Sequence, residues 1–251
     1  MLNQADLDFE WVIINDGKDA GTRQFIQSTE LPFAHQYLEI DHPPEGFGLC
    51  IARNLGIDAA RGEYICYLDD DNSLRAEFVA TINTWIEQQP QCRFFLPQQW
   101  RRRDVLKDGQ VIKQGTPFVS PHPETTLKDL ITQRSLFDSN GFTHQRIGAP
   151  RWNPHYRIFC DYEFFLQCIS QCDITWGEQF FFNPKVLVNY IQTTDGIIGQ
   201  SGYVEWAREL QQLYDERLAY GGIRADWADW MPQAIQKYQQ KSQTPLPAFA
   251  R

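Results

Sequence analysis

Three consecutive aspartates, Asp69, Asp70 and Asp71, follow a short apolar segment of the chain. Carboxylates this close together repel one another, and a divalent cation removes that cost. Mg²⁺ and Mn²⁺ prefer oxygen ligands, and proteins commonly hold them with one or two carboxylates together with substrate phosphates. The triplet therefore predicts a site for a divalent cation and a phosphate-bearing ligand. An acidic turn that caps the following helix is the alternative, and the triplet alone does not separate the two.

The elements that must position this triplet are predicted from the spacing of apolar residues. Short apolar runs predict strands at residues 9–14, 34–40, 63–68 and 92–97, and a strand, a turn and a second strand within 180–191. Helical spacing predicts helices at residues 23–28, 48–60, 74–87, 127–137 and 161–171. This alternation is typical of an α/β fold with a mostly parallel, Rossmann-like sheet flanked by helices. Ligands bind beyond the carboxyl ends of such strands, where the triplet lies.

Two further parts of the chain are expected near the site and at its flank. Residues 100–124 are polar and contain prolines, which is typical of a hairpin or a mobile loop over a site. Polar helices are expected at 203–220 and 227–240, and three tryptophans lie on one side of them, namely Trp206, Trp227 and Trp230. Because the polar faces of these helices are not basic, we expect them to pack against the domain or a second subunit rather than a membrane.

Length and charge limit the class of protein. The 251 residues suit one domain at 1–200 followed by a helical extension and tail at 201–251. A net charge of −9 argues against a nucleic-acid partner. No stretch approaches the roughly 20 apolar residues of a membrane span and no signal peptide is evident, so we expect a cytoplasmic protein. Attachment to the membrane surface and a homo-oligomer are left open.

The six cysteines are expected to be reduced and mostly buried, because none forms the C-x2-C pair of a zinc site. Cys168 and Cys172 lie one helical turn apart, which leaves a weak metal or redox pairing open.

Two segments resemble the family 2 glycosyltransferases of the GT-A fold. GLCIARNLGIDAARGEYICYLDDDN, residues 48–72, is similar to the family's signature stretch that ends in a D-x-D motif. FEWVIINDGKDAGT, residues 9–22, resembles the family's second strand and the turn after it. The resemblance implies transfer of a sugar from a nucleotide-diphosphate sugar, with a UDP-sugar favoured, to an acceptor hydroxyl. It also implies an inverting reaction that needs Mn²⁺ or Mg²⁺. The acceptor, whether a saccharide, a lipid-linked sugar or a protein, leaves no trace in the sequence.

The resemblance also implies roles for individual residues. Asp69 and Asp70 would lie at the ribose and diphosphate of the donor, and Asp71 would coordinate the metal. Asp16 matches a position that contacts the nucleotide base, and Asn15 replaces the acidic residue that usually precedes it. Arg53 matches the arginine of the signature, where it either contacts the base or a phosphate or only braces the fold.

A second pair of segments, SLFDSNGF (135–142) and CDYEFFLQC (160–168), resembles the family's later motifs, including the helix that carries the catalytic base. Asp161 occupies the position of the base, which must take the proton of the acceptor hydroxyl. Glu163 is the second candidate for the base. Because Asp161 and Glu163 are two residues apart on a helix, their side chains cannot both point into one site. We expect Glu163 to face solvent. The alternative is that Asp161 is only the N-terminal cap of its helix.

The sequence departs from the family pattern in two places. It begins at what would be the second strand, and in a strand order of the 3-2-1-4 type the missing strand would be central and leave unpaired backbone on both sides. Either the sheet closes differently, or another segment or subunit fills the gap, or the sequence lacks its true beginning. After Tyr190 there is no histidine to complete the metal site, so Asp195 or water would substitute.

One basic cluster and two functions other than sugar transfer remain to be weighed. The run Arg101 to Arg103 either attracts an acceptor phosphate or lies in a solvated turn. The chain could be a nucleotide-sugar binding protein that has lost turnover. It could also be a nucleotidyltransferase that uses the acidic cluster for phosphoryl transfer.

Overall fold

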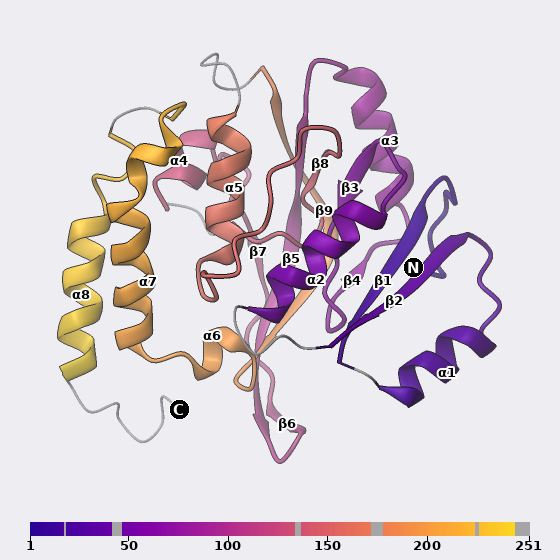
Figure 1. The fold of residues 1–251 in the computed structure, drawn as a ribbon, viewed down its shortest axis with the longest axis horizontal. Coiled ribbons are helices and arrows are strands. Elements are labelled where there is room, and N and C mark those ends of the chain that lie inside the picture. The colour runs from indigo at the N-terminus through magenta and orange to yellow at the C-terminus, as the bar shows by residue number, and fades with distance from the viewer. Residues whose placement is uncertain (18, 42–46, 134–136, 172–177, 224–225, 244–251) are drawn as a thin grey trace.

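The computed structural model describes residues 1–17, 19–41, 47–133, 137–171, 178–223 and 226–243 (Figure 1). The strands are β1 (Glu10–Asp16), β2 (Ala34–Ile40), β3 (Tyr64–Cys66), β4 (Ser73–Leu74), β5 (Phe94–Lys107), β6 (Gln110–Lys113), β7 (Phe118–Ser120), β8 (Thr143–Gln145) and β9 (Phe180–Thr193). The helices are α1 (Ala20–Ser28), α2 (Gly48–Ala59), α3 (Phe78–Gln88), α4 (Leu127–Ile131), α5 (Cys160–Ser170), α6 (Ile197–Gln200), α7 (Tyr203–Asp215), η1 (Arg217–Tyr220) and α8 (Met231–Gln243).

The strands form two sheets. A seven-stranded sheet has the order β3-β8-β5-β9-β4, with β6 and β7 paired to β5, and β1 and β2 form a separate parallel pair. The two long strands β5 and β9 run parallel, whereas β8 is antiparallel to both β3 and β5, and β4 is antiparallel to β9. The predicted α/β fold with a helix-flanked sheet is confirmed. The sheet is mixed rather than mostly parallel, because the short strands β4, β7 and β8 pair antiparallel with their neighbours.

Alternating side chains of β5 build a hydrophobic core on each face of the large sheet. Phe94 and Leu96 face a core that is shared with α2, α5, α7 and α8. Phe95, between them, faces the opposite core, which it shares with α3. Successive side chains of a strand point to opposite faces, so a continuous apolar run such as this one requires cover on both sides. Figure 1 shows α2 and α5 together on one side of the sheet.

A wide gap separates the two sheets. Among the described residues, no strand pairs with the second edge of β1 or with the outer edge of β3. The start of β1 stays close to the start of β3, because the Glu10 carboxylate accepts a hydrogen bond from the backbone N–H of Gly62 (2.9 Å). Between the strands lies a cavity of about 2100 Å³ whose walls include apolar residues of α2 and α3. Within the described residues the sheet does not close by another route, and the predicted unpaired edges are present on both sides.

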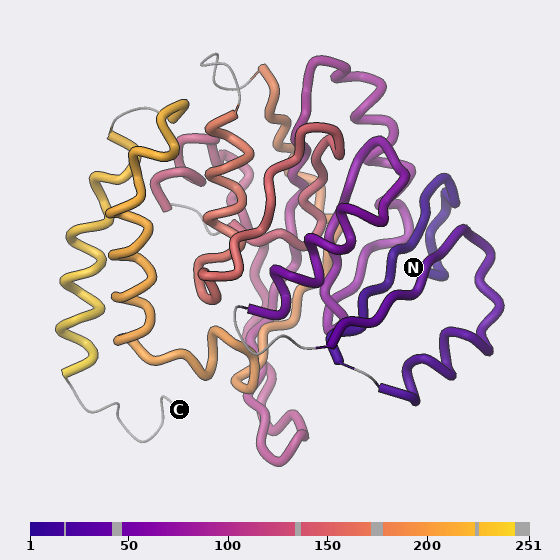
Figure 2. Tube along the Cα trace, viewed as in Figure 1, coloured from indigo at the N-terminus to yellow at the C-terminus, as the bar shows by residue number. Residues whose placement is uncertain are grey.

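Several predicted boundaries need correction. Residues 100–124 do form a hairpin, but β5 continues through Lys107 before it turns into β6, and this hairpin projects beyond the body of the molecule (Figure 2). Arg101 to Arg103 therefore lie in a strand rather than a solvated turn. Residues 180–193 form one strand, not two. The helix expected from residue 74 begins at Phe78, and the one expected at 127–137 ends at Ile131, with 134–136 outside the described residues.

The C-terminal helices pack against the rest of the chain, as predicted. Trp227 is buried, the Trp206 ring lies edge-on to Phe159, and the Trp230 ring lies edge-on to Tyr162. Figure 1 shows α7 and α8 as an adjacent pair beside α5. No helix in the described ranges is both long and apolar enough to cross a membrane. The division of the chain after residue 200 stays a prediction.

Cys50, Cys66, Cys92 and Cys160 are free thiols, as expected. Cys50, Cys92, Cys160 and Cys168 are buried, whereas Cys66 is exposed and lines the cavity between the sheets. Cys172 lies outside the described residues, so its predicted relation to Cys168 is not described.

Candidate active site

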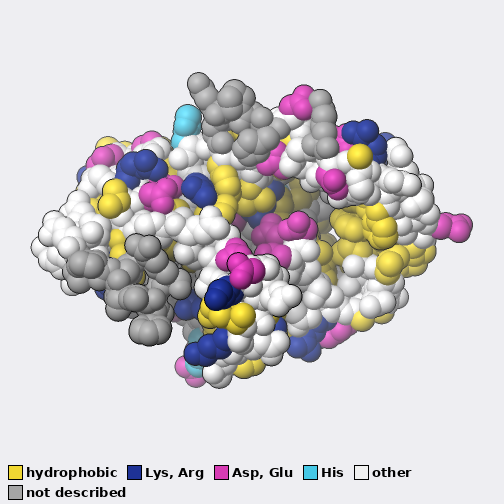
Figure 3. All heavy atoms as spheres, turned by 90° about the horizontal axis from the view of Figure 1, so that it is seen from below, with side chains coloured by type: hydrophobic (Ala, Val, Ile, Leu, Met, Phe, Trp, Pro, Cys, Tyr) yellow, Lys and Arg dark blue, Asp and Glu magenta, His cyan; other side chains and the backbone are white. Residues whose placement is uncertain are grey.

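The cavity between the sheets opens onto a cluster of acidic residues at the carboxyl ends of β1 and β3. Figure 3 shows acidic side chains gathered around a hollow on this face of the molecule. All the residues predicted for the site line this one cavity, namely Asn15, Asp16, Arg53, Asp69, Asp70, Asp71 and Asp161. They come from four separate elements or the turns that follow them, so the fold brings together what the sequence keeps up to 146 positions apart.

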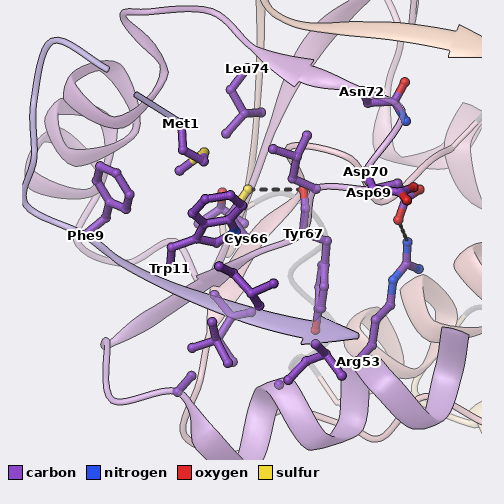
Figure 4. Close-up of a pocket in the computed structure, with 18 of the residues that line it drawn as sticks. Met1, Phe9, Trp11, Arg53, Cys66, Tyr67, Asp69, Asp70, Asn72 and Leu74 are labelled. Atoms are coloured by element: carbon purple, nitrogen blue, oxygen red, sulfur yellow. Dashed lines mark hydrogen bonds and ion pairs between the residues drawn. The ribbon is translucent and has the colours of Figure 1, made fainter. Parts of the chain in front are cut away.

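Arg53 on α2 is the centre of the cluster. Its Nη2 lies 2.7 Å from Oδ1 of Asp69 and its Nη1 lies 2.8 Å from Oδ1 of Asp161. The guanidinium also lies 4.3 Å from the centre of the Trp152 ring and 5.4 Å from that of Tyr67, which adds cation–π stabilisation. Burial opposes its charge, but the carboxylates of Asp69 and Asp161 outweigh burial and raise the pKa of Arg53. Figure 4 shows the side chain reaching from its helix to Asp69. Both alternatives for Arg53 remain, and this geometry favours the brace.

Asp69 is fixed by a second partner, Asn140. The backbone N–H of Asp69 donates to Oδ1 of Asn140 (2.8 Å), and Nδ2 of Asn140 donates to Oδ2 of Asp69 (2.9 Å). Burial alone would raise the pKa of Asp69, but Arg53 and this hydrogen bond lower it. Both carboxylate oxygens are thus engaged within the protein. Asp69 therefore holds the end of the strand in place, which leaves Asp70 and Asp71 as the aspartates of the triplet that would contact a ligand.

Asp161 lies in the first turn of α5. The residue at the N-cap of α5 is Phe159, so Asp161 does not cap its own helix and that alternative is wrong. The chain before α5 is held instead by Glu209 of α7, whose Oε2 accepts the backbone N–H groups of Arg157, Ile158 and Phe159 at 2.8–3.2 Å. Burial raises the pKa of Asp161, and so do the charges of neighbouring carboxylates, against the opposing effect of Arg53.

Glu163 does not face solvent, as we had expected from its polar neighbours on the helix. It is only 2% exposed and accepts hydrogen bonds from Tyr220 (2.7 Å) and from Nε2 of Gln167 (2.9 Å). It does not line the cavity. The reason is tertiary: η1 packs against this side of α5, which a helical projection of the sequence cannot reveal. Glu163 is therefore excluded as a reserve base by its position.

Asp71 is the predicted metal ligand, and the charges around it fit a cation. Burial raises its pKa to about 6, and the charges of Asp69, Asp70 and Asp138 act in the same direction. The loop is tied down by Asn72, which donates to Asp71 (2.7 Å) and accepts the backbone N–H of Ile191 in β9 (2.8 Å). A cation bound here would relieve this excess of negative charge.

Protein ligands for such a cation are few. The part of the chain that the structure describes holds no group of three or more His, Cys, Asp or Glu side chains that could bind a metal ion. Asp195, suggested as a substitute ligand, does not line the cavity. The donor set fits Mg²⁺ or Mn²⁺ in the form in which one or two carboxylates act together with substrate phosphates and water.

Asn15 and Asp16 end β1 on the far side of the cavity. Asn15 donates to the hydroxyl of Tyr37 (3.0 Å) on β2, and that hydroxyl donates in turn to Glu39 (2.8 Å). Asp16 is exposed at the cavity wall, followed by Gly17 at φ +112°, a conformation that favours glycine. Asp16 therefore ends β1 at the cavity wall, next to a turn that a glycine makes possible.

Two site residues were missed in the sequence. Asp138 and Asn140 lie in the segment SLFDSNGF, which resembles a family motif but for which no site residue was predicted. The segment forms a turn: Gly141 adopts φ +82°, and a Cβ there would come 2.5 Å from Val188. Its effect is to bring Asn140 against Asp69 and to place Asp138 in the cavity wall. Two polar residues just before such a glycine were the available signal.

The chain is similar to glycosyltransferases in sequence and in fold. The sequence model described as "Glycosyl transferase family 2" matches residues 1–146. The "Putative teichuronic acid biosynthesis glycosyltransferase TuaG" of Bacillus subtilis (strain 168) is 27% identical over 77 residues, which cover 31% of this chain and 30% of that protein.

Among solved structures, residues 1–349 of S. aureus TarS match with a TM-score of 0.64 and 12% identity, over 96% of this chain and 66% of that one. The same TarS fragment in complex with UDP-GlcNAc matches with a TM-score of 0.63 and 11% identity, over 95% and 65%. The fragment in complex with UDP matches with a TM-score of 0.61 and 12% identity, over 96% and 64%. The chain thus spans less than a third of TuaG and just under two thirds of the TarS fragment. The likeness to TarS confirms the predicted GT-A type of fold.

Proposed function

The chain belongs to glycosyl transferase family 2, and we propose that it transfers a sugar from a nucleotide-diphosphate sugar to an acceptor hydroxyl, with a divalent cation and with inversion at the anomeric carbon. The observation that carries this proposal is the double ion pair of Arg53. One buried guanidinium joins Asp69 at the strand end to Asp161 at the helix start, so the donor end and the proposed base share one cavity.

Asp161 acts as the base in this proposal. Its carboxylate takes the proton of the acceptor hydroxyl while the hydroxyl oxygen attacks the anomeric carbon and the bond from that carbon to the diphosphate oxygen breaks. A single displacement of this kind inverts the anomeric centre. Burial and the neighbouring carboxylates raise the pKa of Asp161, which makes it a stronger base, and Arg53 opposes this rise.

Asp16, Asp70 and Asp71 are proposed to bind the donor. Asp71, with its excess of surrounding negative charge, would hold Mn²⁺ or Mg²⁺ together with the diphosphate, Asp70 would lie near the ribose or diphosphate, and Asp16 near the base. When bound, the cation neutralises the charge that develops on the leaving diphosphate. Arg53 and Asn140 keep the strand end rigid, which lowers the cost of ordering the site when the donor binds.

The donor and acceptor classes are proposed from the relatives. TarS forms complexes with UDP and with UDP-GlcNAc, which supports a uridine nucleotide as the donor to test first. The name of TuaG, which assigns it to teichuronic acid biosynthesis, supports a saccharide as the acceptor to test first.

Release of UDP from UDP-GlcNAc, with and without Mn²⁺, tests the reaction, and a panel of short oligosaccharides serves as acceptors. Thermal stabilisation by UDP, GDP, TDP and CMP compounds tests the donor base, because a ligand of the native state raises the melting temperature. We expect Mn²⁺-dependent stabilisation by UDP that Asp71→Asn abolishes. Donor binding without UDP release under all acceptors would favour a binding protein, and pyrophosphate release from a nucleoside triphosphate would favour a nucleotidyltransferase.

A further inference from the structure

Asp138 is a buried carboxylate that the proposed reaction leaves without a role. It is 8% exposed and belongs to the wall of the cavity. Its Oδ1 atom accepts three hydrogen bonds, from Nε2 of Gln99 (3.0 Å), from the backbone N–H of Asn140 (2.9 Å) and from Nδ2 of Asn140 (3.1 Å). Three donors on one oxygen fix the plane and direction of the carboxylate.

The second oxygen of Asp138 is not used in this way. No described residue donates a hydrogen bond to Oδ2, although the carboxylate is more than nine-tenths buried. Oδ2 can therefore accept a hydrogen bond from water or from a ligand. The cavity is the side from which a donor can reach it, because Asp138 contributes to the cavity wall.

A chain of buried polar groups keeps Asp138 in this orientation. Nε of Arg101 donates to Oε1 of Gln99 (2.7 Å). This fixes the orientation of the Gln99 amide, so that its Nε2 carries the N–H groups that point away from Arg101. These reach Asp138 and the backbone oxygen of Asn140 (2.7 Å). Arg101 is 4% exposed, has no acidic partner within ion-pair distance among the described residues, and stacks on the ring of Tyr190 at 4.6 Å. These contacts hold the Asp138 carboxylate in one orientation.

Asp138 lies near the residues proposed for both halves of the reaction. It lines the same cavity as Asp71 and Asp161, and Nδ2 of Asn140 donates both to its Oδ1 (3.1 Å) and to Oδ2 of Asp69 (2.9 Å). In a transfer between a diphosphate held near Asp71 and a base at Asp161, the group that lies between them is the sugar that is transferred. A sugar offers several hydroxyl donors, and a hydroxyl that donates to a carboxylate forms a short, strong hydrogen bond.

We propose that Oδ2 of Asp138 accepts a hydrogen bond from a hydroxyl of the transferred sugar, and that Asp138 thereby determines which donor sugars are accepted. This inference rests on the proposed function. It predicts that binding of the sugar part of the donor depends on Asp138, whereas binding of the nucleotide part does not.

Asp138→Asn tests the proposal, with calorimetric measurement of the dissociation constants of UDP and UDP-GlcNAc in the presence of Mn²⁺. Glu163→Gln is the matched control, because Glu163 is an equally buried carboxylate that lies outside the cavity. We expect Asp138→Asn to weaken UDP-GlcNAc roughly tenfold or more, the effect of losing a hydrogen bond to a charged group, and to leave UDP unchanged. The control should change neither constant.

A series of deoxy donors tests the same point on the unaltered protein, so that the proposal does not depend on folding of the variant. UDP-sugars that each lack one hydroxyl are compared with UDP-GlcNAc. One of them should bind the natural protein roughly tenfold more weakly and bind Asp138→Asn as well as UDP-GlcNAc does.

Four results would overturn the inference. Equal weakening of UDP and UDP-GlcNAc would assign Asp138 to the metal and diphosphate instead. Unchanged binding of both by the folded variant, or no loss for any deoxy donor, would remove Asp138 from sugar recognition and leave the proposed function intact. A natural protein that binds no nucleotide sugar at all would instead reject the proposed function, and this inference with it.

Discussion

Arg53 and Asp161 are 108 positions apart in the sequence, and Nη1 of the guanidinium lies 2.8 Å from Oδ1 of the carboxylate. The same guanidinium binds Asp69, so the proposed base and the end of β3 are coupled through one buried cation. The coupling sets the charge state of Asp161 as well as its position, because the cation counteracts the rise in pKa that burial and the other carboxylates cause.

Arg53→Met should raise the pKa of Asp161. Without the guanidinium, burial and the charges of Asp69 and Asp138 act unopposed on this carboxyl. A base must be deprotonated to act, so the acidic limb of the pH profile of kcat should move to higher pH. Removing one partner of a buried ion pair should also lower the free energy of unfolding by about 2 kcal/mol, less than for a fully buried pair because the two carboxylates are partly exposed.

The measurements are a pH–rate profile and denaturant unfolding. Arg151→Met is the control, because Arg151 pairs with Asp58 on the exposed surface of α2 and should affect neither quantity by much. An unchanged acidic limb in Arg53→Met would show that Arg53 does not set the protonation of the base.

Asp161→Asn should reduce kcat by about 100-fold or more, the usual contribution of a general base. The amide keeps the size of the side chain and can still accept a hydrogen bond from Arg53, so the dissociation constant for the nucleotide sugar should change little. Steady-state kinetics combined with calorimetry separates the two effects. Full activity in Asp161→Asn would reject Asp161 as the base.

The parts of the fold that depend on local pattern were predictable. The strand at 34–40 and the helix at 48–60 match β2 and α2 to within a residue, because apolar spacing, glycines and turn residues mark their ends. The predicted site residues share one cavity, and most of them lie at the ends of elements: Asn15 and Asp16 end β1, the three aspartates follow β3, and Asp161 is in the first turn of α5, whereas Arg53 lies within α2.

The parts that depend on tertiary packing were not predictable. β8 has three residues, too few to show a period, so the antiparallel insertion between β3 and β5 left no signal. Residues 180–191 were predicted as two strands with a turn between them, yet β9 is continuous. Pro184 lies where the register of β9 against β5 shifts, and a proline is tolerated at such an irregularity. The hydrogen bond from Tyr220 that covers Glu163 and the one from Gln99 to Asp138 join residues 57 and 39 positions apart.

His144 should make stability depend on pH. It is buried, its Nδ1 lies 2.7 Å from the backbone oxygen of Gln145, and its Nε2 lies 2.8 Å from the Tyr67 hydroxyl, an arrangement that suits the neutral ring. Burial lowers the pKa of His144 from 6.5 to about 4. Between these values the unfolded chain binds a proton that the folded protein does not, so stability falls as pH decreases through this window.

The size of this effect is about 3 kcal/mol between pH 7 and pH 4, from 1.36 kcal/mol for each unit of pKa shift. The measurement is the free energy of unfolding in urea at several pH values for the natural protein and for His144→Gln, in which the amide can replace both hydrogen bonds. The variant should lack this part of the pH dependence. His155→Gln, at an exposed position, should retain it. Parallel curves for the natural protein and His144→Gln would contradict the neutral, buried state of this ring.

The backbone amides of β1 should exchange with solvent faster than those of β5. β1 pairs only with β2 among the described strands, and a two-stranded sheet is marginally stable by itself, whereas β5 lies between β8 and β9 and has core residues on both faces. Local opening should therefore cost less at β1, and we expect exchange at least about 100-fold faster there, equivalent to roughly 2.7 kcal/mol. Hydrogen–deuterium exchange with mass spectrometry measures peptides over 10–16 and 94–104, with 180–193 of β9 as the slow reference. Equal rates in the three peptides would mean that the small sheet opens only when the whole molecule unfolds, and that the gap between the sheets does not weaken it.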